Sequence, residues 1–171
     1  MPTQQFTRRG FLRAGLATAA ATLGIPGSVI AGMQAGDRPK GVTLSDLAGA
    51  KVALPEAYAG KVVAVHFWAT WCPYCIKEIE ALEALFGQYR ERGFIPVSVN
   101  VGEPKAVVTE SLRNRKVTYP ILLDTESATA RLYGVAGVPT TFVLDRTGSV
   151  AFRVLGEIDL EGLRRILSGM L

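Results

Sequence analysis

Two cysteines separated by two residues directly follow an apolar stretch of the chain. That stretch, residues 61–68, holds Val, Ala, Phe and Trp after a first lysine and is interrupted by one histidine. Such a run is typical of a central strand buried on both faces. Apolar side chains then recur every three or four positions over residues 73–92, which predicts a helix. Cys72 and Cys75 therefore lie where a buried strand passes into a helix.

Cysteines at this spacing can close into a small disulfide ring and reopen by thiol exchange. Cys72 is expected at the helix N-terminus, where unpaired backbone N–H groups and the helix dipole favour a thiolate. We therefore predict that Cys72 is the attacking nucleophile and that Cys75, one turn later, resolves the mixed disulfide. Pro73 suits the first helical turn, and Tyr74 is placed to contact partner thiols and to help tune the pair.

Two other roles for the cysteines are less favoured. A disulfide between residues three apart restricts the unfolded chain less than a long-range bridge does, which argues against a structural role. Half of a metal site is the second alternative, but Cys72 and Cys75 are the only cysteines and His66 is the only histidine. Because a four-ligand zinc site needs more of these ligands, we expect no metal and no other cofactor.

The composition limits the class of protein. A chain of 171 residues fits one domain with a sizeable core, and its 49% of hydrophobic residues excludes disorder. The net charge of +4 is concentrated at the N-terminus, because the first 31 residues carry three arginines and no acidic residue. The rest carries 16 basic and 15 acidic residues. This near-neutral body gives no support for nucleic-acid binding.

The first 31 residues have the organisation of an export signal. The segment around Arg8 and Arg9 resembles the twin-arginine motif, an Ala-rich stretch follows to Ile25, and Ala31 precedes a plausible cleavage point. The alternative is a membrane anchor, but an apolar run of about a dozen residues is short for a span of ~20. We expect residues 1–31 to be a twin-arginine signal peptide, residues 32–41 a linker, and the protein to be periplasmic. Whether the signal is cleaved, and where, stays open.

The remaining patterns predict an alternation of strands and helices. Strands are expected at 42–44, 51–54, 61–68, 94–101, 119–123, 140–145 and 149–155. Helices are expected at 73–92, 104–115, 128–133 and 160–171. This order predicts an α/β sandwich whose sheet contains both parallel and antiparallel strands.

Two motifs resemble those of thioredoxin-fold proteins. Residues 67–75, Phe-Trp-Ala-Thr-Trp-Cys-Pro-Tyr-Cys, resemble the active-site segment, and residues 134–145 resemble the second thioredoxin signature. The hairpin before the active site and the extra βα unit between Val101 and Leu123 resemble the TlpA-type exported branch. That branch includes the ResA and CcmG thiol-disulfide oxidoreductases of cytochrome c maturation. The resemblance covers residues 42–171 and implies a thioredoxin-like three-layer α/β/α sandwich with a mixed central sheet, an N-terminal β-hairpin and a central βα insertion.

The resemblance also implies where substrate binds. Val138-Pro139 would be a cis-proline loop beside the cysteines, with Val138 offering its backbone to an extended substrate segment. Trp71 and Tyr74, which flank the cysteines, are the expected side-chain contacts to substrate. The alternative for Pro139 is an ordinary turn proline before a strand.

His66 and Glu78 are candidates for tuning the thiols, together with Pro73. Thioredoxins carry a buried aspartate at the position of His66, and the TlpA-type branch often has asparagine there. A histidine, whose unperturbed pKa is about 6.5, could assist proton transfer at the resolving cysteine. We favour the alternative of a neutral core histidine satisfied by a hydrogen bond, because burial opposes the charged form. Glu78 resembles the family's usual glutamate, and we expect it on a solvated face rather than as a catalytic acid.

These observations predict an exported thiol-disulfide oxidoreductase. The favoured direction is reduction of disulfides in periplasmic proteins, such as apocytochrome c or metal-site assembly factors, with a thiol-reductase in the membrane as electron donor. We expect a monomer that acts on protein thiols and disulfides. Pro73-Tyr74 is the glutaredoxin dipeptide between thioredoxin-like flanks, which predicts a reduction potential between about −270 and −150 mV.

Other activities use the same fold. An oxidase or isomerase would use the same residues in the opposite direction. A copper chaperone is disfavoured because such carriers typically use C-x-x-x-C with a distant histidine, and this chain has one spacer fewer and no histidine in its second half. A peroxidase is disfavoured because its usual isolated nucleophilic cysteine is missing.

Overall fold

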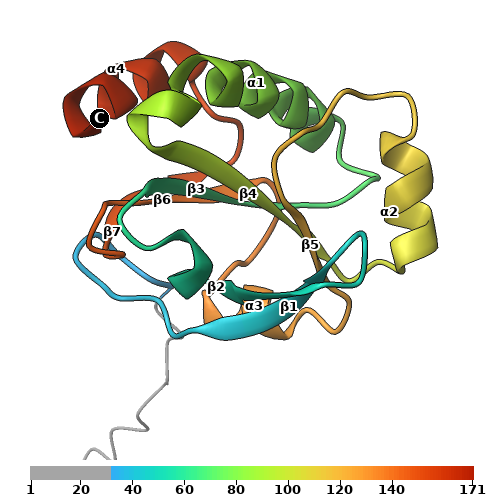
Figure 1. The fold of residues 1–171 in the computed structure, drawn as a ribbon. Helices are drawn as coiled ribbons and strands as arrows, with labels where there is room; N and C mark the ends of the chain where they lie inside the picture. Colours follow the sequence, from blue (N-terminus) through green and yellow to red (C-terminus); the bar gives the residue numbers. More distant parts are fainter. Residues whose placement is uncertain (1–31) are drawn as a thin grey trace, which may run out of the picture.

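A seven-stranded sheet forms the centre of the molecule. The computed structural model describes residues 32–171, and the strand order is β2-β1-β5-β4-β3-β6-β7. Helices α1 and α4 cover one face of the sheet and α3 lies on the other (Figure 1). The α/β fold class, the mixed sheet and the N-terminal hairpin predicted from the sequence are confirmed.

The elements follow the predicted order. The strands are β1 (Val42–Asp46), β2 (Lys51–Leu54), β3 (Val62–Trp68), β4 (Phe94–Val101), β5 (Ile121–Asp124), β6 (Thr140–Leu144) and β7 (Val150–Leu155). The helices are α1 (Pro73–Tyr89), α2 (Lys105–Leu112), α3 (Ala128–Leu132) and α4 (Leu160–Met170), with short 3₁₀ turns η1 (Glu56–Tyr58) and η2 (Arg90–Arg92).

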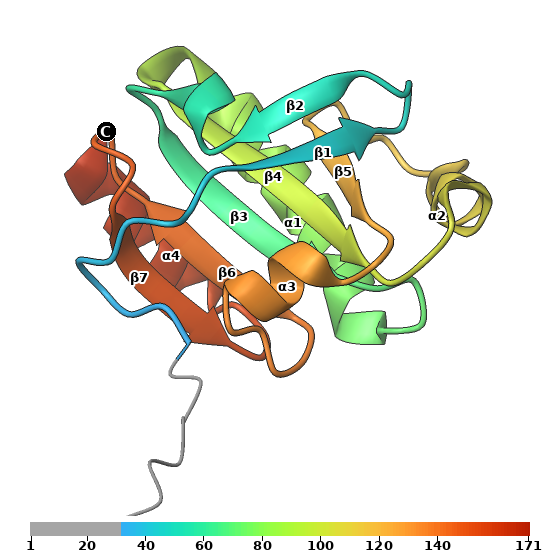
Figure 2. The same ribbon diagram turned by 90° about the horizontal axis from the view of Figure 1, so that it is seen from below.

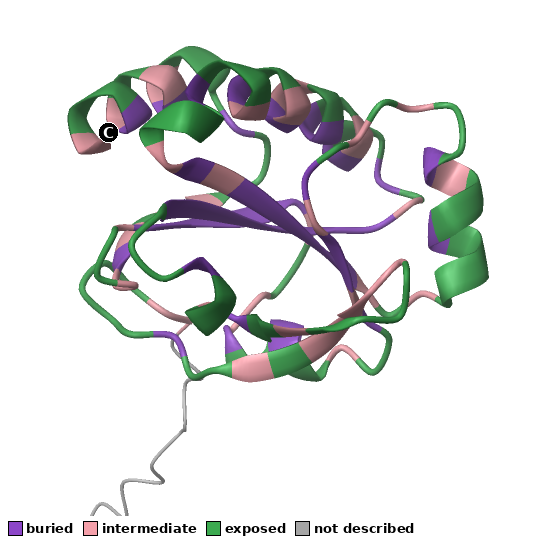
Figure 3. Ribbon diagram, in the orientation of Figure 1, coloured by how far each residue is buried: buried purple, intermediate pink, exposed green. Residues whose placement is uncertain are grey.

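The central strand β3 is buried along its whole length, as Figure 3 shows for the middle of the sheet. Successive side chains of a strand point to opposite faces. Ala64 and Trp68 belong to the core beneath α1 and α4, while Val65 and Phe67 belong to the core on the α3 side. His66 lies on the same face of β3 as Ala64 and Trp68, so its imidazole faces α1.

The carboxyl ends of β3, β4 and β5 lie at the same edge of the sheet. Strands β3, β4 and β5 run parallel, while β6 is antiparallel to β3 and β1 is antiparallel to β5. Figure 2 shows the parallel strands side by side, with α3 in front of them. The carboxyl ends of the three parallel strands meet at the edge where α1 begins, which is the usual place for a site in an open α/β sheet.

Most elements differ from the prediction by one to three residues at one or both ends, and β1 extends two residues further, to Asp46. Three of the larger differences lie at the ends of α1 and α2 and at the start of β5. Helix α1 ends at Tyr89 and passes through η2 to Gly93, whose φ of 93° is left-handed. The predicted helix 104–115 ends at Leu112, and residues 113–115 form a turn in which Arg115 N donates to Leu112 O. Strand β5 starts at Ile121 rather than at residue 119, since Pro120 has no N–H to give to a sheet.

Two further features complete the fold. The peptide bonds Leu54–Pro55 and Val138–Pro139 are both cis, and only the second was expected. The segment predicted as a linker lies along β7, where Gly36 N donates to Val150 O at 2.8 Å and Val150 N donates to Asp37 O at 2.9 Å.

Among residues 32–171, no helix has the length and apolar character needed to cross a membrane. The predicted signal peptide, residues 1–31, lies outside the described residues.

Candidate active site

The two cysteines form a disulfide at the start of α1. Cys72 is the N-cap of the helix, with an extended backbone, and its Sγ accepts a hydrogen bond from Cys75 N at 3.2 Å. Pro73 occupies the first helical turn, as predicted. Cys72 is 4% exposed and Cys75 is fully buried. The first cysteine is therefore the more accessible, and it sits among the free N–H groups of a helix end, where a thiolate is stabilised.

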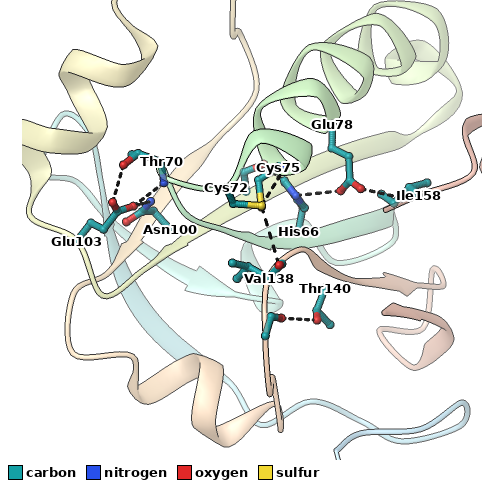
Figure 4. The surroundings of a disulfide bond; sticks show 12 residues. His66, Thr70, Cys72, Cys75, Glu78, Asn100, Glu103, Val138, Thr140 and Ile158 are labelled. Carbon is teal, nitrogen blue, oxygen red and sulfur yellow. Dashed lines mark hydrogen bonds and ion pairs between the residues drawn. A yellow bond between two sulfur atoms is a disulfide. The ribbon is translucent and has the colours of Figure 1, made fainter. Parts of the chain in front are cut away.

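The loop before β6 lies against the first cysteine. Cys72 Sγ is 3.9 Å from the carbonyl oxygen of Val138, and the following bond to Pro139 is cis (Figure 4). The loop is held by Thr140, whose Oγ1 donates to Gly137 O at 2.7 Å. The structure thus brings Val138 and Pro139 to the cysteines across 66 residues of sequence.

Two aromatic side chains stand out around the disulfide. Trp71 is 72% exposed and Tyr74 is 53% exposed, although both are next to a cysteine. Lys77 Nζ lies 5.6 Å from the centroid of the Tyr74 ring. A single exposed aromatic needs no explanation, but two beside a reactive disulfide offer an apolar contact surface to another protein.

A shallow groove of about 280 Å³ opens beside Trp71. Its lining is mostly small and apolar, with the charged side chain of Arg131 from α3 as an exception. Ala69, Trp71, Val101, Arg131 and Val138 are among its lining residues. Because Val138 also contacts Cys72, the groove leads to the disulfide.

A buried histidine and a buried glutamate lie close together beneath the disulfide. His66 Nε2 on β3 is 3.1 Å from Glu78 Oε2 on α1, and both side chains are buried. The two atoms are close without forming a well-aligned hydrogen bond. Glu78 Oε1 accepts a hydrogen bond from Ile158 N at 2.7 Å. The expectation that Glu78 lies on a solvated face is wrong: Glu78 is one turn after Cys75 on the buried side of α1.

The other side of His66 contacts a short polar chain. His66 Nδ1 is 3.1 Å from Ser98 Oγ, which is 3.2 Å from the hydroxyl of Tyr119. That hydroxyl donates to Ile79 O at 3.3 Å. Burial raises the pKa of Tyr119 well above its ordinary value, so the phenol is a neutral donor. The prediction that His66 lies in the core and makes a hydrogen bond is confirmed, and its predicted neutral state stays a prediction. Its pairing with a buried glutamate was not foreseen.

A second carboxylate holds the loop that carries the first cysteine. Glu103, just after β4, accepts from Thr70 N at 2.8 Å, from Thr70 Oγ1 at 2.5 Å and from Asn100 Nδ2 at 2.7 Å. Figure 4 shows this cluster on the opposite side of Cys72 from the His66–Glu78 pair. Sequence reasoning did not identify Glu103, because Thr70 is 33 residues away.

The arrangement is suited to exchange of thiols and disulfides. One sulfur lies near the surface at a helix N-terminus, its partner is buried directly behind it, and a carbonyl of the cis-proline loop is adjacent. In the range 32–171, His, Cys, Asp and Glu form no group of three or more able to hold a metal ion.

Comparison with known proteins agrees with this chemistry. The AhpC/TSA family model matches residues 35–153. The thiol-disulfide oxidoreductase ResA of Geobacillus thermodenitrificans is 35% identical over 127 residues, which are 74% of this chain and 72% of that protein. The ResA protein of Bacillus anthracis is 30% identical over 135 residues, or 79% of this chain and 78% of that protein.

Solved structures give the same result. A protein of Chlorobium tepidum described as a thiol:disulfide interchange protein DsbE superposes with a TM-score of 0.76 at 30% identity, covering 81% of this chain and 99% of that one. StoA from Bacillus subtilis superposes with a TM-score of 0.63 at 25% identity, covering 74% of this chain and 96% of that one. The chain therefore belongs to the AhpC/TSA family and is a thioredoxin-fold thiol-disulfide oxidoreductase of the ResA/DsbE type.

Proposed function

We propose that this oxidoreductase reduces disulfides in proteins outside the cytoplasm through a Cys72/Cys75 dithiol cycle. The observation that carries the proposal is the position of Cys72: it caps α1, touches the carbonyl of Val138 and lies between two exposed aromatic side chains. An extended substrate segment that pairs with the backbone of Val138 would bring its own disulfide to this sulfur.

Each turn of the cycle transfers two electrons to the substrate. The Cys72 thiolate attacks one sulfur of the substrate disulfide, forms a mixed disulfide and releases the other substrate sulfur as a thiolate, which takes up a proton. Cys75 then loses its proton and attacks Cys72 Sγ, so that the enzyme disulfide forms and the second substrate thiol leaves. The greater exposure of Cys72 and the complete burial of Cys75 support this division of roles.

The proposed location rests on the leader sequence and on the relatives. The twin-arginine pattern around Arg8 and Arg9 supports export to the periplasm. There, a thiol-reductase in the membrane would return the enzyme to its dithiol form. The resemblance to the TlpA-type branch implies substrates such as apocytochrome c or metal-site assembly factors. Oxidation or isomerisation by the same residues is the alternative direction.

Trapping of substrates tests the proposal. A Cys75→Ser variant should stop at the mixed disulfide, because nothing resolves it. When this variant is expressed with its leader, periplasmic proteins should be captured through Cys72 and released by dithiothreitol, while a Cys72→Ser control captures none. Equal capture by both variants, or capture of cytoplasmic proteins only, would contradict the proposal.

A further inference from the structure

We propose that Glu103 is a positioning residue for Cys72, acting through Thr70. The inference rests on the proposed role of Cys72 as the nucleophile, and it is independent of the substrate and of the direction of electron flow.

The four residues Ala69 to Cys72 form a β-turn. Cys72 N donates to Ala69 O at 3.2 Å, so Thr70 and Trp71 occupy the two corner positions. The turn ends at the N-cap of α1, and its shape decides where Cys72 Sγ lies relative to Cys75 N–H and Val138 O. A change at Thr70 therefore moves the reactive sulfur and the exposed Trp71 together.

Glu103 holds the first corner of this turn with both of its oxygens. Oε2 accepts from Thr70 N and Oε1 accepts from Thr70 Oγ1, so neither the backbone nor the side chain of Thr70 can rotate freely. Among ordinary side chains, only a carboxylate can accept these two bonds and a third from Asn100 Nδ2. A glutamine would present an N–H₂ group to one of these donors.

The hydrogen bonds of Glu103 with Thr70 and Asn100 form a clamp on the active-site turn. This clamp is attached to the central sheet. Asn100 is fully buried on β4, in register with Trp68 of β3 and Leu123 of β5. Gly102 makes the sharp turn that aims Glu103 back toward Thr70: its φ is +75°, and a Cβ there would lie 3.1 Å from Ser127 Oγ. Gly102 N also donates to Asp124 O at 3.0 Å. Glu103 thus connects the active-site turn to the ends of three parallel strands.

The chain contains a matched control. Glu83 on α1 accepts from Thr118 N and Thr118 Oγ1, both at 2.7 Å, in the same two-point arrangement. Both glutamates are partly buried, but Thr118 is exposed whereas Thr70 is partly buried. That clamp fixes the loop before β5. Glu83→Gln therefore removes equivalent bonds without touching the turn that carries Cys72.

The test measures how the reactivity of Cys72 depends on pH. All proteins carry Cys75→Ser, so that Cys72 is the only thiol, and the rate of its alkylation by iodoacetamide is followed from low to high pH. The titratable groups drawn around the disulfide in Figure 4 besides Glu103 are His66 on β3 and Glu78 on α1, while the Val138 loop contributes a carbonyl. His66 and Glu78 stay unchanged in every variant.

In both Glu103→Gln and Glu103→Asp, the turn loosens and Cys72 Sγ leaves the N–H groups that stabilise its thiolate. The midpoint of the alkylation profile should rise by about half a pH unit, which lowers the rate below the midpoint about threefold. Glu83→Gln should have the same alkylation profile as the parent, which is the protein that carries Cys75→Ser alone. Thr70→Val, which removes only the hydroxyl, should also raise the midpoint of the alkylation profile. This variant tests the inference if a Glu103 variant does not fold.

Two results would overturn the inference. If the charge of Glu103 acted alone, Glu103→Gln would lower the midpoint and raise the rate, while Glu103→Asp would match the parent. If Glu103 were only a structural contact, its variants would lose stability as Glu83→Gln does and leave the profile unmoved. A parent midpoint near the ordinary thiol value of about 8.5 would instead contradict the proposed role of Cys72.

Discussion

His66 Nε2 lies 3.1 Å from Glu78 Oε2, and this contact joins the central strand to the active-site helix one turn below Cys75. The other partners of the pair are Ser98 Oγ on the histidine and the backbone N–H of Ile158 on the glutamate. Burying two such groups is unfavourable unless they compensate each other. The pairing is therefore expected to matter both for stability and for the thiols.

Replacing His66 with asparagine should destabilise the fold. The Glu78 carboxylate would stay buried without its partner, a loss typically worth about 3–5 kcal/mol. Urea unfolding of His66→Asn, Glu78→Gln and the double variant measures this, and the double variant should be more stable than the two single losses added together. Strict additivity would show that the two side chains do not interact.

The same His66→Asn variant tests whether the pair tunes the thiols. If it does, the pH dependence of Cys72 alkylation should differ between the variant and the wild type, because the charge distribution beneath the disulfide has changed. Superimposable curves would reject a tuning role and leave His66 as a core residue.

Alkaline pH should destabilise the protein through two buried tyrosines. Burial raises the pKa of both Tyr119 and Tyr133 above the ordinary value of 10.0. The folded state then keeps phenol protons that the unfolded chain gives up. Stability should be fully present below pH 10 and should fall as the pH rises above about 10.

Tyr133→Phe isolates this effect. The Tyr133 hydroxyl has no hydrogen-bond partner among the described residues, so its removal should change stability near neutral pH by less than about 1 kcal/mol. The decline of the unfolding free energy above about pH 10 should be shallower than in the wild type. An equally steep decline would show that Tyr133 is not responsible.

Trp71 should contribute to substrate recognition more than to stability. It is 72% exposed and borders the groove beside Val138. Trp71→Ala should leave the unfolding free energy within about 0.5 kcal/mol, as is usual for surface changes, and should lower kcat/KM for a protein disulfide about tenfold through the loss of one aromatic contact.

A matched control is Phe152→Ala on β7, since Phe152 is also aromatic and 41% exposed. Reduction of a protein disulfide and of a small disulfide should be compared in both variants. If the two variants behaved alike, Trp71 would have no specific role in binding protein substrates.

The sequence predicted those features of the fold that local pattern determines. Strand β3 was recognisable because a continuous apolar run in a strand requires burial on both faces, and Gly93 marked a helix end because it could adopt a positive φ. The end of α2 was placed three residues too late, because Arg113 and Arg115 are good helix formers and nothing local shows that the chain must turn there.

The active site was predicted where a motif exists. Cys72, Cys75, Val138 and Pro139 lie together as the two signatures implied. The roles of His66, Glu78 and Glu103 depend on contacts between distant elements. A glutamate within an amphipathic helix is usually solvated, and only the packing of α1 on β3 shows that Glu78 is not. Its spacing of three from Cys75 was the one available signal, since residues three apart share a helix face.

The reduction potential of the Cys72/Cys75 pair tests the central claim most directly. Equilibration of the wild-type protein in glutathione buffers, with dithiothreitol buffers for the most reducing points, followed by counting of free thiols by mass, should show a single two-electron transition between about −270 and −150 mV. A potential below about −300 mV would indicate a structural disulfide, and one above about −140 mV would indicate an oxidant. Either result would contradict a dithiol enzyme that reduces disulfides in its substrates.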